Sequence, residues 1–204
     1  MLGGIAGFAE QTITIKKSFN EGIIKTDKHS AGGIIGQLYT GKGTIEQCYN
    51  ANSVQAQVSM AGGIAGFFGK GEIKQCYNKG TITAMTQSAG GIIGNFQNTT
   101  QVTDCYNTAT ITSTNEKYRG GIAGGATTLT GTATGDYKIT INNCYLLENK
   151  VDKSLGQDAL LQGDDAIVKS EADMKTQEFV DSLGNTIWKI DKKQNNGYPI
   201  FLWQ

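Results

Sequence analysis

Cysteines offer this chain its widest chemistry, because thiolates bind metals, form disulfides and act as nucleophiles. The four are Cys48, Cys76, Cys105 and Cys144. They form no Cys-x-x-Cys pair of the kind found in zinc sites, and the chain has a single histidine. Each cysteine recurs at one position of a repeated phrase, so we expect a stacked column of buried free thiols. Disulfides between neighbouring repeats are the alternative, disfavoured because parallel side chains lack the necessary offset.

The other catalytic residue types are also poorly arranged. His29 lies in a polar stretch, and no Gly-x-Ser-x-Gly nucleophile accompanies it, so we expect an exposed loop histidine. Glycoside hydrolysis needs two carboxyl groups facing one another. Glu72 and Asp104 occupy different repeat positions, whereas Lys16, Glu46 and Lys74 share one position. This column predicts alternating charge pairs on a solvated face.

These observations predict no catalytic residue, no metal ligand and no cofactor-binding residue. The Gly-Gly-x-Gly-x-Asp repeat of calcium-binding solenoids is missing from the sequence. Threonine columns, Thr81 with Thr110 and Thr83 with Thr112, are too short and too interrupted to predict an ice-binding array.

A repeated glycine phrase organises the elements that carry these residues. Gly-Gly-Ile-x-Gly occurs five times, and its first glycines lie 29, 30, 28 and 30 residues apart, at Gly3, Gly32, Gly62, Gly90 and Gly120. A fixed period of this length is typical of solenoids, propellers and arrays. A propeller blade needs about 40 residues, and helical repeats need an apolar period of about 3.6, so both fit less well.

A second phrase, Cys-Tyr-Asn, alternates with the first. β-Branched residues precede and follow it, which predicts three short strands in each repeat. We therefore expect an all-β β-solenoid, similar to a parallel β-helix, of about five coils of ~29 residues and three strands each. Its ladders would include a core column of isoleucines and a column of hydrogen-bonded asparagines at a bend: Ile5, Ile34, Ile64, Ile92 and Ile122; Asn20, Asn50, Asn78 and Asn107.

The fifth repeat departs from the pattern by about ten extra residues before Cys144. We expect a protruding loop there. Its candidate ligand-contact residues are Thr127, Thr128, Thr130, Thr132, Thr134 and Asp136.

The repeats end near Val151, which predicts a solenoid over residues 1–151 and a capping region over residues 152–204. A short helix ending at Gly184 and a turn at Asn195-Asn196-Gly197 predict a small α+β cap. Both tryptophans lie in this region, and we expect its aromatic residues to cover the open end of the last coil.

Composition limits the partners. The chain carries 18 basic and 18 acidic residues, so no electrostatic footprint for nucleic acid is present. No apolar stretch is long enough for a transmembrane helix, and the start has no signal-peptide pattern. Because the sequence begins inside a repeat, we expect it to be part of a longer protein.

The alternation of Gly-Gly-Ile-x-Gly with Cys-Tyr-Asn-x-Gly resembles the GLUG-motif family of bacterial cell-surface proteins. The resemblance covers residues 3 to about 146 and is clearest at Cys76-Tyr77-Asn78-Lys79-Gly80. It implies secretion and a cell-surface setting, and it implies no catalytic residues. The first copy departs from it, with Ser18-Phe19 in place of Cys-Tyr.

We therefore expect a non-enzymatic module for adhesion or display on a bacterial surface. It would bind an extracellular glycan or a host-matrix protein through the solenoid faces or loops, within a larger surface protein. The alternatives are a structural stalk without a ligand and a carbohydrate-active β-helix enzyme.

Overall fold

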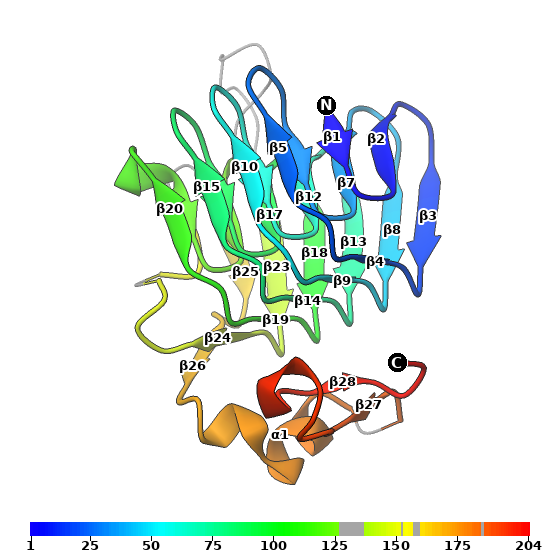
Figure 1. The fold of residues 1–204 in the computed structure, drawn as a ribbon. Coiled ribbons are helices and arrows are strands. Elements are labelled where there is room, and N and C mark those ends of the chain that lie inside the picture. Colours follow the sequence, from blue (N-terminus) through cyan, green and yellow to red (C-terminus); the bar gives the residue numbers. More distant parts are fainter. Residues whose placement is uncertain (127–136, 152, 157–159, 185) are drawn as a thin grey trace.

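The chain winds into a β-solenoid of stacked parallel strands, as the computed structural model in Figure 1 shows. The structure describes residues 1–126, 137–151, 153–156, 160–184 and 186–204. Each coil contributes one strand to each of several parallel sheets, which run along the solenoid axis. The expected all-β solenoid is confirmed.

Five parallel sheets result, and each is named here by its first strand. The β1 sheet contains β1 (Leu2–Gly3), β6 (Ala31–Gly32), β11 (Ala61–Gly62), β16 (Ala89–Gly90) and β21 (Arg119–Gly120). The β2 sheet contains β2 (Ala6–Ala9), β7 (Ile35–Leu38), β12 (Ala65–Phe68), β17 (Ile93–Phe96) and β22 (Ala123–Ala126). The β5 sheet contains β5 (Ile24–Thr26), β10 (Val54–Ala56), β15 (Ile82–Ala84) and β20 (Ile111–Ser113).

The two remaining parallel sheets carry the segments before and after each cysteine. The β3 sheet contains β3 (Ile13–Lys16), β8 (Gly43–Glu46), β13 (Gly71–Lys74), β18 (Thr100–Thr103), β23 (Lys138–Asn142) and β25 (Leu160–Gly163). The β4 sheet contains β4 (Phe19–Asn20), β9 (Tyr49–Asn50), β14 (Tyr77–Asn78), β19 (Tyr106–Asn107), β24 (Tyr145–Leu147) and β26 (Ile167–Lys169). Bends thus divide two of the three predicted strand segments of each coil into shorter strands.

The solenoid makes about four turns, slightly fewer than the five expected. Its β5 sheet has one strand from each of the first four coils and ends at β20. Among the described residues after β24, the chain adds no strand to the β5 sheet, and β25 and β26 extend the β3 and β4 sheets. A fifth copy of the glycine phrase is therefore present, but the described part of its coil does not complete a turn.

The core forms because alternate side chains of each strand point inward. Ile34, Ile64, Ile92 and Ile122 are fully buried and stack as predicted. Ile5 differs, since its side chain is 50% exposed. It belongs to the first coil, whose outer edge has no neighbouring coil in this structure.

Glycines of the repeated phrase are required by close backbone approach. A Cβ added to Gly32 would lie 2.0 Å from the carbonyl oxygen of Ile35, and one added to Gly63 would lie 2.1 Å from that of Gly91. Positive φ angles recur at the residue that precedes Ser18 or the cysteine of each coil: Lys17, Gln47, Gln75, Asp104 and Asn143. The left-handed corner therefore precedes the cysteine, and the asparagine of Cys-Tyr-Asn is not the residue that makes it.

The C-terminal region adds a short 3-10 helix (Asp173–Lys175), α1 (Gln177–Ser182), a second 3-10 helix (Asn195–Gly197) and a hairpin of β27 (Trp188–Lys189) with β28 (Ile200–Phe201). The hydroxyl of Thr176 caps α1 by accepting from the amide of Phe179 at 3.2 Å. A further 3-10 helix (Glu116–Tyr118) lies between β20 and β21. Helix content is small, and no helix among the described residues is long and apolar enough to cross a membrane.

Candidate ligand-binding groove

The ligand-contact residues predicted from the sequence all lie outside the residues that the structure describes: Thr127, Thr128, Thr130, Thr132, Thr134 and Asp136. Within the described residues, no group of three or more His, Cys, Asp or Glu side chains is arranged to hold a metal ion. His29 is exposed, as expected for a loop histidine.

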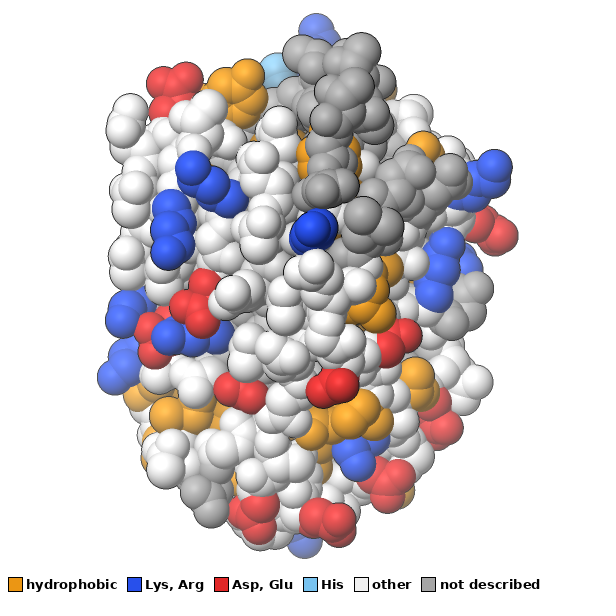
Figure 2. All heavy atoms as spheres, turned by 180° about the vertical axis from the view of Figure 1, so that it is seen from behind, with side chains coloured by type: hydrophobic (Ala, Val, Ile, Leu, Met, Phe, Trp, Pro, Cys, Tyr) orange, Lys and Arg blue, Asp and Glu red, His pale blue; other side chains and the backbone are white. Residues whose placement is uncertain are grey.

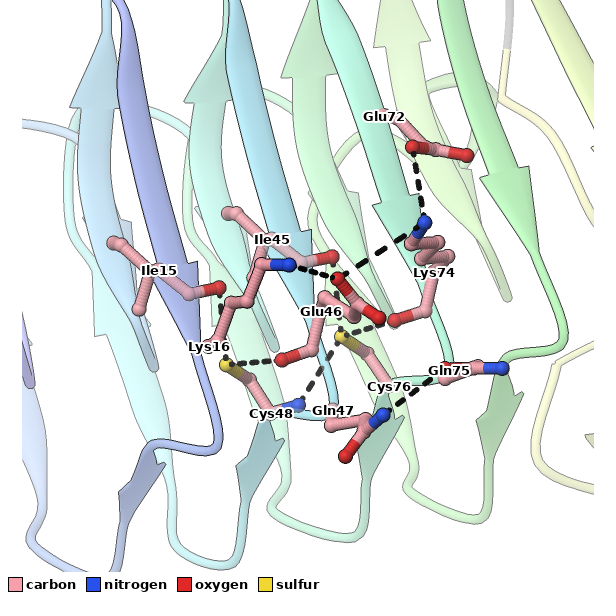
Figure 3. Close-up of polar contacts among 10 residues, drawn as sticks. All are labelled: Ile15, Lys16, Ile45, Glu46, Gln47, Cys48, Glu72, Lys74, Gln75 and Cys76. Carbon is pink, nitrogen blue, oxygen red and sulfur yellow. Dashed lines mark hydrogen bonds and ion pairs between the residues drawn. The ribbon is translucent and has the colours of Figure 1, made fainter. Parts of the chain in front are cut away.

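The four cysteines form the predicted column of buried free thiols. Their sulfurs satisfy backbone groups, since the Cys76 thiol donates to the carbonyl of Lys74 at 3.2 Å and accepts from the amide of Cys48 at 3.4 Å (Figure 3). Burial raises the pKa of the Cys76, Cys105 and Cys144 thiols. A buried thiol with a raised pKa is a poor nucleophile, so these three cysteines are structural. The hydrogen bond with Cys76 lowers the pKa of Cys48, which is equally enclosed in the core.

The charged column on the β3 sheet is also a packing feature (Figure 3). The Glu46 carboxylate lies 2.8 Å from the ammonium of Lys16 and 4.0 Å from that of Lys74, which in turn lies 3.6 Å from Glu72. The hydrogen bond from Lys16 holds the pKa of Glu46 below its usual value. This confirms the predicted alternation of charge between coils.

Asparagine side chains form a second ladder inside the solenoid. Asn20, Asn50 and Asn78 each donate Nδ2–H to the Oδ1 of the next asparagine at 2.8 Å, ending at Asn107. Each Nδ2 also donates to the carbonyl two residues further along its own coil, as Asn78 does to Gly80 at 3.0 Å. The predicted ladder is confirmed, and it fixes the bend that follows the neighbouring aromatic column.

An aromatic stack occupies the outer side of the β4 sheet. The rings of Phe19, Tyr49, Tyr77 and Tyr106 are nearly parallel, with successive centroids 5.1, 4.8 and 5.0 Å apart. The spacing follows from the strand separation of about 4.8 Å, which places identical residues of neighbouring coils face to face. Only Phe19, in the first coil, is largely exposed, at 46%.

The C-terminal region packs along this stack. Trp188 lies against Tyr77 and Tyr106, with ring centroids 6.1 and 5.7 Å apart, and Phe201 lies 5.5 Å from Tyr77. Figure 1 shows α1 and the β27–β28 hairpin beside β9, β14 and β19. The expectation that these aromatics cover the end of the last coil is therefore corrected. They cover the aromatic stack along the side of the solenoid. At the end of the solenoid, β25 and β26 extend two of the sheets.

Two hollows lie along the seam between the solenoid and the C-terminal region, and we call them together the seam groove. The first, about 510 Å³, is lined by Phe19, Glu21, Tyr49, Tyr77, Lys79, Gln194, Asn195, Ile200, Trp203 and Gln204. The second, about 450 Å³, is lined by Ala51, Lys79, Thr108, Leu147, Lys150, Glu171, Asn195, Asn196 and Tyr198. Lys79 and Asn195 border both, so the two hollows are neighbours along the seam.

Hydrogen bonds across the seam hold the groove in shape. Gln204 donates to the hydroxyl of Tyr77 at 3.1 Å, and Asn195 donates to the hydroxyl of Tyr106 at 3.0 Å. The Tyr106 hydroxyl donates to the carbonyl of Pro199. These bonds tie the C-terminal wall of the groove to two different coils of the solenoid wall.

Acidic groups of the groove already have partners. Glu21 accepts from the Tyr49 hydroxyl at 3.2 Å, and Glu171 pairs with Lys175 at 2.6 Å. Burial, and then the charge of the neighbouring carboxylate, raise the pKa of Tyr49 and of Tyr198 to about 12. These phenols remain neutral at physiological pH and can both donate and accept hydrogen bonds.

Sequence reasoning missed this groove. The Tyr of each Cys-Tyr-Asn phrase and the aromatic C-terminal region are both visible in the sequence, but nothing local indicates that one packs along the other. The available signal was the recurrence of Tyr next to an inward-facing Cys, which puts the aromatic on the opposite face of the strand, where a large apolar column marks an interaction site.

The geometry defines a β-solenoid of glycine-rich coils with an aromatic seam. A family model described as the GLUG motif matches residues 85–112, a segment that contains Gly90-Gly91-Ile92 and Cys105-Tyr106-Asn107. The chain therefore carries the GLUG motif, and the expected resemblance is confirmed. Because the same phrases pair in register in the neighbouring coils, the motif corresponds to one turn of this solenoid.

A solved structure from Bacteroides ovatus, provisionally named an immunoglobulin A1 protease, is similar in fold. The TM-score is 0.62 at 22% sequence identity, over 99% of this chain and 68% of that one. At this identity the likeness shows the architecture alone. A comparison with curated protein sequences found no match.

Proposed function

We propose that this chain is a non-enzymatic adhesion or display module of a bacterial cell-surface protein, and that it binds an extracellular ligand through the seam groove. The observation that carries the proposal is the groove itself, an open hollow lined by aromatic rings and hydrogen-bonding side chains. Binding sites combine apolar contact area with a few fixed polar groups in this way.

The solenoid suits display because its ladders continue from coil to coil. Stacked asparagines, aromatics and buried isoleucines tie each coil to the next, which makes the repeat a stiff rod. The face drawn in Figure 2 intersperses acidic, basic and hydrophobic side chains, so no single sign of charge dominates it.

An enzyme is the rival that one observation favours, since the similar Bacteroides ovatus structure is provisionally named a protease. Against it, Glu21 and Glu171 lie in separate hollows and are each already paired. Hydrolysis of a glycan needs two carboxyl groups on either side of one bond. Hydrolysis of a peptide needs an activated nucleophile or a metal, and no Ser, Cys or His lines either hollow. A stalk without a ligand is the second rival.

Arrays of glycans and host-matrix proteins, probed with the purified chain at physiological salt, test the proposal. We expect saturable binding to one class, retained after residues 127–136 are replaced by a short glycine linker. Loss of binding in that variant would place the ligand on the loop instead of the groove. If the folded chain binds nothing on either array, the stalk is favoured. Cleavage of an arrayed ligand would favour the enzyme.

A further inference from the structure

We propose that the seam groove binds a linear, uncharged oligosaccharide. This inference rests on the proposed function and names the ligand class of the same site. Four properties of the groove carry it: the aromatic surfaces, the side-chain amides, the charge and the length.

Aromatic surface is available at the first hollow. Phe19 and the half-buried Trp203 both line this hollow, and their ring centroids lie 6.4 Å apart. The indole Nε1 of Trp203 is enclosed, so this residue offers a ligand its ring and not its N–H. Flat aromatic rings suit the C–H face of a sugar ring, which is apolar although its edge is polar.

Amide side chains surround these rings. Gln194, Asn195 and Gln204 line the first hollow, and Asn195 and Asn196 line the second. An amide donates and accepts at one end of a side chain, which matches neighbouring hydroxyls that each do both. Asn195 and Gln204 are oriented by the tyrosine hydroxyls across the seam, so part of the ordering cost of binding is already met.

Charge favours a sugar over a nucleic acid. The first hollow combines one lysine, Lys79, with one glutamate, Glu21. In the second, Lys150 and the shared Lys79 stand with Glu171, which already pairs with Lys175. A strand of phosphates requires a strongly basic track, since phosphate neutralisation supplies most of its affinity.

The groove is long because it follows the solenoid axis. The solenoid residues of the two neighbouring hollows run from Phe19 in the first coil to Leu147 in the fifth, and a ligand that spans both passes Lys79 and Asn195. Four steps of about 4.8 Å give a length on the order of 19 Å. Several consecutive sugar rings fit this length, so a linear oligosaccharide is favoured over a single sugar.

The test is calorimetric titration of the whole chain with four hexasaccharides: cellohexaose, laminarihexaose, mannohexaose and chitohexaose. We expect saturable binding of at least one, weakened tenfold or more by Trp203→Ala and by Gln194→Ala. Leu202→Ala and Lys192→Ala are the matched controls, because these exposed neighbours lie outside the lining and should bind as the unchanged chain does.

Every other outcome of these titrations overturns the inference, and the outcomes differ in whether the proposed adhesive function survives. Gln194 is exposed and its side chain bonds Asp191, so circular dichroism first confirms that Gln194→Ala is folded. Unchanged affinity in that variant places the sugar elsewhere and leaves the adhesive function standing. Binding of a matrix protein or of a thymidine hexanucleotide, with no hexasaccharide bound, replaces the ligand class. No binding by hexasaccharides or by any array component rejects the proposed function as well.

Discussion

Each asparagine of the ladder makes hydrogen bonds both within its own coil and to the neighbouring coils. Asn78 is fully buried, donates to Asn107 and Gly80, and accepts from Asn50 at 2.8 Å. It also accepts from the amide of Gly80 at 3.2 Å. One side chain therefore closes a turn within its own coil and joins two neighbouring coils. Buried polar groups of this kind are stabilising only while every partner is present.

Substitution of Asn78 tests that coupling. We expect Asn78→Ala to lower the free energy of unfolding by about 2 kcal/mol, because the groups around it lose partners in a dry environment. Asn20→Ala is the control at the end of the ladder, where one neighbour exists and the cost should be about 1 kcal/mol. Urea denaturation followed by circular dichroism measures both. Equal losses in the two variants would mean that the ladder has no cooperative character.

Coils are stabilised chiefly by the coils on either side of them. Ile64 and Ile5 occupy the same repeat position, but Ile64 lies in a central coil and is fully buried, whereas Ile5 is 50% exposed at the first coil. Burial at this position is therefore a property of stacking and not of the residue. Substitutions at Ile64 and Ile5 therefore compare a buried and an exposed site at the same repeat position.

Introduction of a charge at the two positions exploits this comparison. Ile64→Asp would bury an unpaired carboxylate and is expected to cost more than about 4 kcal/mol or to unfold the chain. Ile5→Asp leaves the new carboxylate in contact with water and should shift the melting temperature little. Thermal denaturation at pH 7 separates them, and a wild-type melting temperature for Ile64→Asp would contradict the solenoid register.

Repetition explains why most of the solenoid could be predicted from sequence. Positions that recur every 28 to 30 residues can satisfy one another only by stacking, so the isoleucine, cysteine and asparagine ladders followed directly. The left-handed corners at Gln47 and Gln75 did not follow, because the corner column contains no glycine to mark it. The turn count was also overestimated, because a glycine phrase marks the start of a coil and does not show that the coil is completed.

The groove could not be predicted because it depends on how the two parts of the chain pack together. The repeats and the C-terminal region each have recognisable local patterns. The contact of Trp188 with Tyr77, however, joins residues that are far apart in the sequence and share no repeat period. Hydrophobic patterning indicates that both surfaces are buried against something, but it does not indicate that they pack against each other. The seam is thus a tertiary feature of the whole molecule.

Removal of the Trp188 ring tests whether the seam holds the C-terminal region in place. Trp188 is 2% exposed and packs 4.3 Å from Phe201, centroid to centroid, so Trp188→Ala should destabilise the C-terminal region by about 3–5 kcal/mol. Because the solenoid ladders do not involve this ring, we expect faster proteolysis within residues 170–204 while the β-sheet circular dichroism of the solenoid persists.

Leu202→Ala is the control for that experiment, since Leu202 is 54% exposed on the same segment. Cleavage at the wild-type rate in Trp188→Ala would show that the tyrosine hydroxyl bonds to Asn195 and Gln204 suffice to hold the region. Loss of solenoid and C-terminal region together would instead show one cooperative unit. In the expected case ligand binding is lost while the solenoid remains folded, because half of the groove wall belongs to the C-terminal region. The seam would then be both the attachment of the region and the condition for a binding site.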